Sequence, residues 1–179
     1  MNQLLSIPMG IDCAIYRETV LTHKVLLKIW DMPGQERFHS IAYYYMRGAS
    51  VVMLVYDISD RTTFEPICAR WEHGTRLNSH KRALFVLVGN KSDKSNREVS
   101  REEADTYASA AGFMFFECST STSQSVDHMF MTTAERVLIN HGSRFILDDV
   151  GTNTEHSSLL KRPSNSNHQN HQCLSCQIS

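Results

Sequence analysis

The sequence predicts an α/β fold, a doubly wound and mostly parallel sheet with helices on both faces, followed by a flexible tail. Three apolar runs, at residues 49–56, 83–88 and 113–118, are expected to be strands that are apolar on both faces. Such strands belong to parallel sheets that helices cover on both sides. Segments with helical spacing alternate with these runs, as a doubly wound sheet requires. From Asn153 to Gln172 the composition is dominated by Ser, Asn, Gln and His, which bury too little surface to fold alone.

The remaining elements are predicted from caps, turns and apolar faces. Ser100 with Glu103 forms a capping box at the start of a helix, and Gly112 closes that helix. The other expected elements are two strands, Gly10 to Tyr16 and His23 to Trp30, with a polar turn from Arg17 to Thr22 between them, and a last helix with the apolar face Val126, Met129, Phe130, Ala134 and Val137.

Length and composition restrict the class of protein. A chain of 179 residues fits one domain plus a tail. The formal net charge of -1, without a basic block, argues against a nucleic-acid partner. No apolar run approaches the ~20 residues of a membrane-spanning helix. Five cysteines without the spacing of a disulfide framework predict a reducing, cytoplasmic setting.

A four-residue motif, Asn90-Lys91-Ser92-Asp93, directly follows the apolar run that ends near Val88 and predicts a guanine-binding site. The carboxylate of Asp93 can accept two hydrogen bonds side by side from the ring and exocyclic N–H groups of guanine. Adenine lacks this pair of donors, so such a site rejects it by leaving a charge unpaired. The motif therefore predicts recognition of guanine at the end of a strand.

A second motif, Asp31-Met32-Pro33-Gly34-Gln35-Glu36, follows the expected strand at residues 25–30. A glycine such as Gly34 lets the backbone approach a terminal phosphate. The amide of Gln35 can orient an attacking water molecule, which makes Gln35 the candidate catalytic residue. Together the two motifs predict a site for a guanosine triphosphate.

Over roughly residues 9 to 140 the chain resembles a Rab-type member of the Ras superfamily. The resemblance implies a GTP-hydrolysing switch that binds GTP and GDP with Mg²⁺ and recruits effectors in vesicle and membrane traffic. It also implies exchange factors and GTPase-activating proteins as partners. The segments that carry the resemblance are Met9 to Asp12, Lys28 to Asp31, Gly34 to Phe38, Arg47 to Ala49, Leu54 to Ile58 and Gly89 to Asp93.

The resemblance implies a role for each matched residue. Asp31 would hold Mg²⁺ through water, Gly34 would donate its N–H to the γ-phosphate, and Gln35 would position the hydrolytic water. Trp30 and Tyr45 would form the effector surface. On the guanine side, Asn90 and Lys91 would brace the pocket, Asp93 would bind the base, and a loop similar to the family's ExSAK loop would contribute Ser119, Thr120 and Ser121.

The sequence also departs from the family pattern. It contains no GxxxxGK[ST] phosphate loop and no counterpart of the switch I threonine, and Pro33 removes a backbone donor before Gly34. In the family fold the phosphate-loop segment supplies the central first strand. We therefore expect residues 1–142 to be an N-terminally truncated, incomplete G domain, in which the hairpin of residues 10–30 is separated from the strand at Val51. Two alternatives stay open: a nucleotide-free interaction module, and a truncated isoform without function.

The predicted tail, residues 143–179, ends in a prenylation-like box. Cys176, followed by Gln, Ile and a terminal Ser, matches a CaaX pattern, and Cys173 is a candidate for a second acyl chain. Lipid attachment would place the protein on the cytosolic face of an endomembrane or of the plasma membrane. The alternatives are an unmodified polar tail and a zinc site built from His168, His171 and the two cysteines.

Overall fold

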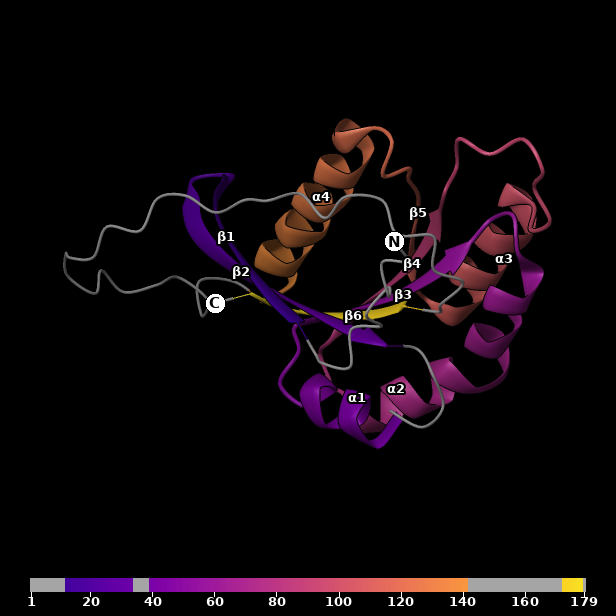
Figure 1. Ribbon diagram of the computed structural model, residues 1–179. Helices are drawn as coiled ribbons and strands as arrows, with labels where there is room; N and C mark the ends of the chain where they lie inside the picture. The colour runs from indigo at the N-terminus through magenta and orange to yellow at the C-terminus, as the bar shows by residue number, and fades with distance from the viewer. Residues whose placement is uncertain (1–11, 34–38, 142–171, 179) are drawn as a thin grey trace, which may run out of the picture.

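The computed structural model describes residues 12–33, 39–141 and 172–178, which form a six-stranded sheet with helices on both faces (Figure 1). The predicted α/β class is thereby confirmed. The strand order across the sheet is β1-β2-β6-β3-β4-β5. The strands are β1 (Asp12–Val20), β2 (His23–Pro33), β3 (Val51–Asp57), β4 (Leu84–Asn90), β5 (Met114–Glu117) and β6 (Gln172–Ile178). The α-helices are α1 (His39–Met46), α2 (Glu72–Asn78), α3 (Arg101–Ala111) and α4 (Ser123–His141).

The centre of the sheet is built on β3, whose residues 51–56 are all buried. Strands β3, β4 and β5 pair in parallel. Alternate side chains of a strand face opposite sides of the sheet, so β3 contributes to two cores. Val51, Met53 and Val55 belong to the core under α4, and Val52, Leu54 and Tyr56 belong to the core on the face of α1, α2 and α3 (Figure 1).

Helix α3 has both predicted ends. The Ser100 hydroxyl accepts a hydrogen bond from the Glu103 backbone N–H at 3.0 Å, which satisfies a donor that the first helical turn leaves open. Gly112 closes the helix in the left-handed conformation, with φ of 67°. The capping box and the closing glycine are confirmed.

The hairpin of β1 and β2 is longer than predicted. Arg17 pairs with Leu26 and Glu18 pairs with Val25, so the expected polar turn from Arg17 to Thr22 is wrong for most of its length. Only Leu21 and Thr22 form the turn. The exposed edge strand β1 tolerates polar side chains on its open face, which made the strand look like a loop.

The most important difference from prediction lies in β6. This strand sits between β2 and β3 and runs antiparallel to both. The sheet therefore has no gap between the hairpin and β3, and seven residues of the predicted flexible tail are a strand. Strands β2 to β5 run in one direction, and β1 and β6 run in the other. The other residues of the predicted tail, 143–171 and 179, lie outside the described part of the chain.

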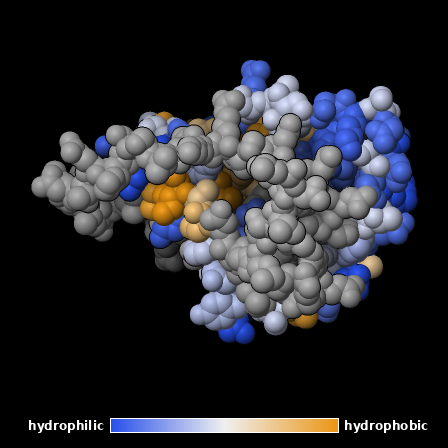
Figure 2. Space-filling model, viewed as in Figure 1, coloured by the Kyte–Doolittle hydropathy of each residue, from blue (hydrophilic) through white to orange (hydrophobic). Residues whose placement is uncertain are grey.

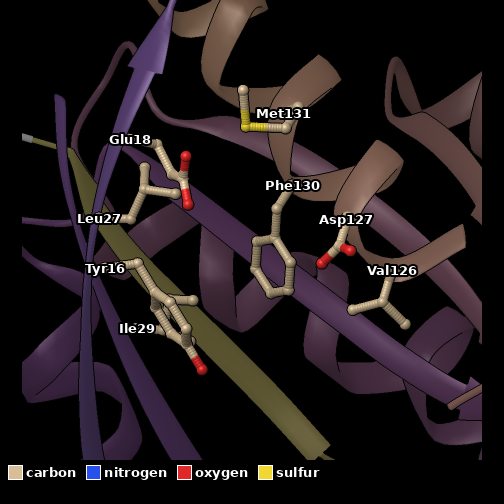
Figure 3. A pocket seen from close by; sticks show the side chains of 8 residues that line it. All are labelled: Tyr16, Glu18, Leu27, Ile29, Val126, Asp127, Phe130 and Met131. Carbon is tan, nitrogen blue, oxygen red and sulfur yellow. The ribbon is translucent and has the colours of Figure 1, made fainter. Parts of the chain in front are cut away.

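No helix within the described ranges is long and apolar enough to cross a bilayer. An apolar patch is nevertheless visible where β1, β2 and α4 meet (Figure 2). A pocket of about 390 Å³ lies between the hairpin and α4 (Figure 3). The pocket contains none of the predicted site residues. It is lined by Tyr16, Glu18, Leu27, Ile29, Val126, Asp127, Phe130 and Met131.

Candidate functional site

The candidate site lies at the edge of the sheet where the parallel strands end. Asp57 is the last residue of β3 and is paired with Asn90, the last residue of β4. Glu117, the last residue of β5, is paired with Gly89. The carboxyl ends of parallel strands form the usual binding edge of an open α/β sheet. The structure thus brings the predicted guanine motif to the expected place.

Lys91 holds this edge together through an ion pair with Asp57. Its Nζ lies 2.6 Å from Oδ2 of Asp57, while the Ser59 N–H and hydroxyl donate to Oδ1 at 2.8 and 2.6 Å. Burial raises the pKa of the Asp57 carboxyl, but the hydrogen bonds from Lys91 and Ser59 outweigh burial and leave the pKa below its ordinary value. The carboxylate at the end of β3 is therefore a charged anchor for the loop after β4.

The backbone of this loop adopts an uncommon conformation that local hydrogen bonds stabilise. Lys91 has φ of 61°, in the left-handed region that non-glycine residues seldom adopt. The Lys91 N–H donates to the side-chain oxygen of Asn90 at 2.7 Å, which stabilises the turn. The Asn90 carbonyl also accepts from the Ile58 N–H at 3.1 Å, tying the loop to β3. Such conformations collect at functional sites.

Asp93 and Ser119 join the two predicted guanine-binding loops. The buried Ser119 hydroxyl donates to Oδ1 of Asp93 and accepts from the Ser121 N–H at 3.1 Å. The backbones are joined as well, because the Ser92 N–H donates to the Cys118 carbonyl at 3.1 Å. Ser119 lies four positions before α4 begins at Ser123, so its hydroxyl links two loops rather than capping the helix.

The Asp93 carboxyl is ionised, as a group that accepts hydrogen bonds from a guanine base must be. Hydrogen bonds from Ser119 and from the Asp93 backbone hold the pKa of its carboxyl below the ordinary value. Asp93 is exposed and thus presents an ionised carboxylate to solvent. Thr120 and Ser121 are also exposed, beside it on the neighbouring loop. The arrangement can accept a pair of N–H groups from a planar base.

The phosphate-side residues are only partly within the described ranges. Asp31 is exposed near the end of β2, whereas Gly34 and Gln35 lie outside the described residues. Through β6, Pro33 is level with Val55, so β2 ends at the same edge as β3. Asp31, two residues before Pro33, therefore lies near the edge of the sheet at which β3 ends.

The two predicted effector residues touch each other. The rings of Trp30 on β2 and Tyr45 on α1 have centroids 4.9 Å apart and are inclined by 45°. Both side chains are half-buried, and the neighbouring Tyr44 is exposed. The predicted pair thus forms one continuous aromatic contact between a strand and a helix.

Two contributors to the site escaped the motif analysis. Asp57 was noticed only as part of a resembling segment, although a carboxylate directly after a buried apolar strand is a usable signal. Glu117 is held by Arg97, with Nη1 2.5 Å from Oε1, and by Arg101 at 3.3 Å. Its side chain is 6% exposed, so these two cations fix the end of β5 and the start of the serine-rich loop.

The donor groups of the described residues determine which metal ion the site can hold. In the ranges that the structure describes, no three His, Cys, Asp or Glu side chains gather into a metal site. Mg²⁺ beside a nucleotide needs only one or two carboxylates, because phosphate oxygens and water complete its shell. The exposed carboxylate of Asp31 fits that requirement. His168 and His171 lie outside the described residues, so the zinc hypothesis stays a prediction.

An NKxD loop and a serine loop that are joined at the carboxyl edge of a parallel α/β sheet are features of the small guanine-nucleotide-binding proteins. The chain belongs to the Ras family, whose sequence model matches residues 4–139. Within that family it is Rab-like, as its curated relatives indicate.

Three relatives are described as Ras-related protein Rab-13. The Bos taurus and Canis lupus familiaris proteins are each 39% identical over 136 residues, which is 75% of this chain and 66% of each relative. The Mesocricetus auratus protein is 36% identical over 162 residues, 90% of this chain and 77% of that relative. The chain thus spans about two thirds of the bovine and canine proteins it matches.

Proposed function

We propose that this chain is a Rab-like molecular switch that binds guanine nucleotides, hydrolyses GTP and acts in vesicle and membrane trafficking. The observation that carries the proposal is the joined pair of loops, in which Ser119 holds the ionised Asp93 at the carboxyl edge of the sheet. Family membership and the names of the Rab-13 relatives support the same function.

On the guanine side, Asp93 accepts the two N–H groups of the base. Asn90 and Lys91 brace the pocket, because one closes the turn and the other pairs with Asp57. Ser119, Thr120 and Ser121 lie on the loop beside Asp93 and complete the pocket. A base without these two donors, such as adenine, leaves the Asp93 carboxylate unpaired and binds more weakly. The site therefore selects guanine over adenine.

On the phosphate side, Asp31 is the residue that would hold Mg²⁺ through water. The ion supplies neutralisation of phosphate charge when it is bound with GTP or GDP. In this proposal the N–H of Gly34 faces the terminal phosphate and the amide of Gln35 orients the attacking water. Gln35 is the catalytic residue of the proposal.

The partners follow from the same proposal. The contacting rings of Trp30 and Tyr45 form the surface for effectors, since an aromatic pair supplies rigid apolar area at low entropic cost. Exchange factors and GTPase-activating proteins would act on the nucleotide edge. A lipid on Cys176, with a second acyl chain on Cys173, would hold the protein on the cytosolic face of a membrane.

Nucleotide binding tests the proposal directly. The purified chain is titrated with fluorescent GDP and with fluorescent ADP in the presence of Mg²⁺. We expect binding of GDP only, and a loss of about tenfold or more in Asp93→Ala, because each hydrogen bond to a charged group contributes ~1.5–3 kcal/mol.

Asp105→Ala is the matched control, since Asp105 is an exposed carboxylate on α3 away from the strand ends. It should bind GDP like the unmodified chain. Equal affinity for GDP and ADP would contradict the proposal, as would unchanged GDP binding in Asp93→Ala. A folded chain that binds neither nucleotide would instead favour the interaction module.

A further inference from the structure

Strand β6 is the one element that joins the two halves of the described sheet. Its residues pair with β2 on one side, from Leu27 to Pro33, and with β3 on the other, from Val51 to Val55. In the described part of the chain β2 and β3 have no direct pairing. Without β6, two long strand edges would be open at the centre of the sheet, beside side chains that are buried in both cores.

The sequence of β6 is unusual for a central strand. Its neighbour β3 is apolar along its length, as expected for a strand that helices cover on both faces. Strand β6 reads Gln-Cys-Leu-Ser-Cys-Gln-Ile, with polar residues at Gln172, Ser175 and Gln177. Backbone pairing on two edges therefore contributes more to its retention than an apolar composition does. A strand that is retained mainly by backbone pairing can leave the sheet.

The connection to the rest of the domain is long enough for exchange. Helix α4 ends at His141 and β6 begins at Gln172, with about thirty residues between them. The entropic cost of closing a loop grows only slowly with its length. The space between the edges of β2 and β3, here called the slot, can therefore receive a strand of the same chain that is distant in sequence.

We propose that residues 172–178 are a removable strand, and that their insertion between β2 and β3 excludes chemical modification of Cys173 and Cys176. In the seated strand, Cys176 is in register with Ile29 and Val51, and Cys173 is in register with Met32 and Leu54. An enzyme that modifies either thiol must bind the surrounding backbone in its own site. The same backbone cannot be paired with β2 and β3 at that time.

The proposal has a direct consequence for lipid attachment, and in this respect it depends on the proposed membrane function. With a prenyl diphosphate as donor, a thioether bond forms between Sγ of Cys176 and the terminal carbon of the lipid. The carbon–oxygen bond of the donor breaks, diphosphate leaves, and the thiol proton passes to solvent. Lipid attachment then requires release of β6, and the attached lipid keeps the strand out of the slot.

Alkylation of the cysteines by iodoacetamide, followed by peptide mass spectrometry, measures the insertion of β6 between β2 and β3. The measurement needs neither nucleotide nor lipid. Failure of the proposed switch function would therefore leave this readout unchanged. We expect Cys173 and Cys176 of the folded chain to react at least about tenfold more slowly than in a synthetic peptide of residues 172–179. Reaction at the rate of the peptide would overturn the proposal.

Two variants at position 175 separate the effect of losing a backbone N–H from the effect of changing the side chain. Ser175→Pro removes a backbone N–H at the middle of the strand, in register with Trp30 and Val52, and a proline is not tolerated in a central strand. It should raise the alkylation rates of both cysteines to those of the peptide. Ser175→Ala retains the N–H and should stay slow. Equal rates in the two variants would contradict the proposal.

Other cysteines report whether the variants are folded. Cys118 is buried, and burial raises the pKa of its thiol to about 11, so it should remain unreactive unless the domain unfolds. If Ser175→Pro exposes Cys118, hydrogen exchange of the unmodified chain decides the question. Protected amides at residues 173–178 support insertion, and exchange at the rate of the free peptide overturns it.

Discussion

Lys91 and Asp57 form an ion pair across the ends of neighbouring parallel strands, with Nζ 2.6 Å from Oδ2. The pair connects the loop after β4 to the end of β3, at the edge where the guanine motif lies. Lys91 adopts a left-handed φ of 61° there. A backbone conformation of this kind persists only when its surroundings hold it, and the ion pair is one such constraint.

Removing the cation should destabilise this edge. Lys91→Met keeps the length of the side chain but leaves the Asp57 carboxylate, which is 15% exposed, without its main partner. We expect a loss of about 1–3 kcal/mol in the free energy of unfolding, measured by urea denaturation. Lys24→Met, at an exposed position of β2, is the control and should change stability little. Equal effects in the two variants would contradict the role of the ion pair.

The lowered pKa of Asp57 predicts a pH dependence of stability. The folded state holds this pKa below the unfolded value of about 3.9, so the native state binds the proton less tightly. The contribution of Asp57 to the free energy of unfolding is therefore present above the unfolded pKa and is lost as pH falls through the lower folded pKa. Asp57→Asn should remove this part of the acid-induced loss. Urea denaturation of the unmodified chain and of Asp57→Asn, from neutral to acidic pH, measures this difference. Parallel curves of unfolding free energy against pH would contradict the role of Asp57.

Gly89 is close to Tyr56 because its strand passes directly beside that ring. A Cβ at position 89 would lie 2.8 Å from the Tyr56 hydroxyl oxygen and 3.1 Å from the Ile58 Cγ2. Gly89→Ala should therefore cost about 1–3 kcal/mol of stability through overpacking. In the double variant with Tyr56→Phe, which lacks that oxygen, part of the loss should be recovered. A double-mutant cycle by thermal unfolding checks this, and strict additivity would argue against the clash.

Gly112 provides a contrasting case at the end of α3. Its φ is 67°, but a Cβ would meet no atom within 4 Å. The cost of Gly112→Ala is then a backbone cost, and we expect about 1 kcal/mol. Gly112→Asn should cost less, because asparagine tolerates this conformation better. Calorimetric melting of the two variants tests the order, and a reversed order would show that backbone strain is not the cause.

The parts of the fold that depend on local patterns could be predicted from the sequence. The apolar strand from Val51 and helix α3 between Ser100 and Gly112 are specified by neighbouring residues, and the structure confirms them. The guanine loops were predicted from their motifs, and the structure joins them through Asp93 and Ser119.

Strand β6 could not be predicted in this way. It mixes polar with apolar residues and so lacks the continuous apolar run of a buried strand, and it pairs with strands that lie well over a hundred residues earlier in the chain. Only the open edges of β2 and β3 select it, and these edges lie on either side of one place only in the folded chain. The ion pair of Asp57 with Lys91 was missed for a related reason, since it depends on the parallel register of β3 and β4.

The identity of the nucleotide that the chain retains on purification shows whether it binds guanine nucleotides. The purified protein is denatured, and the released small molecules are separated by chromatography and compared with GDP, GTP, ADP and ATP standards. We expect GDP or GTP in about equal molar amount to the protein, and a strong reduction in Asp93→Ala. A folded chain that releases no guanine nucleotide and takes none up from solution would contradict it.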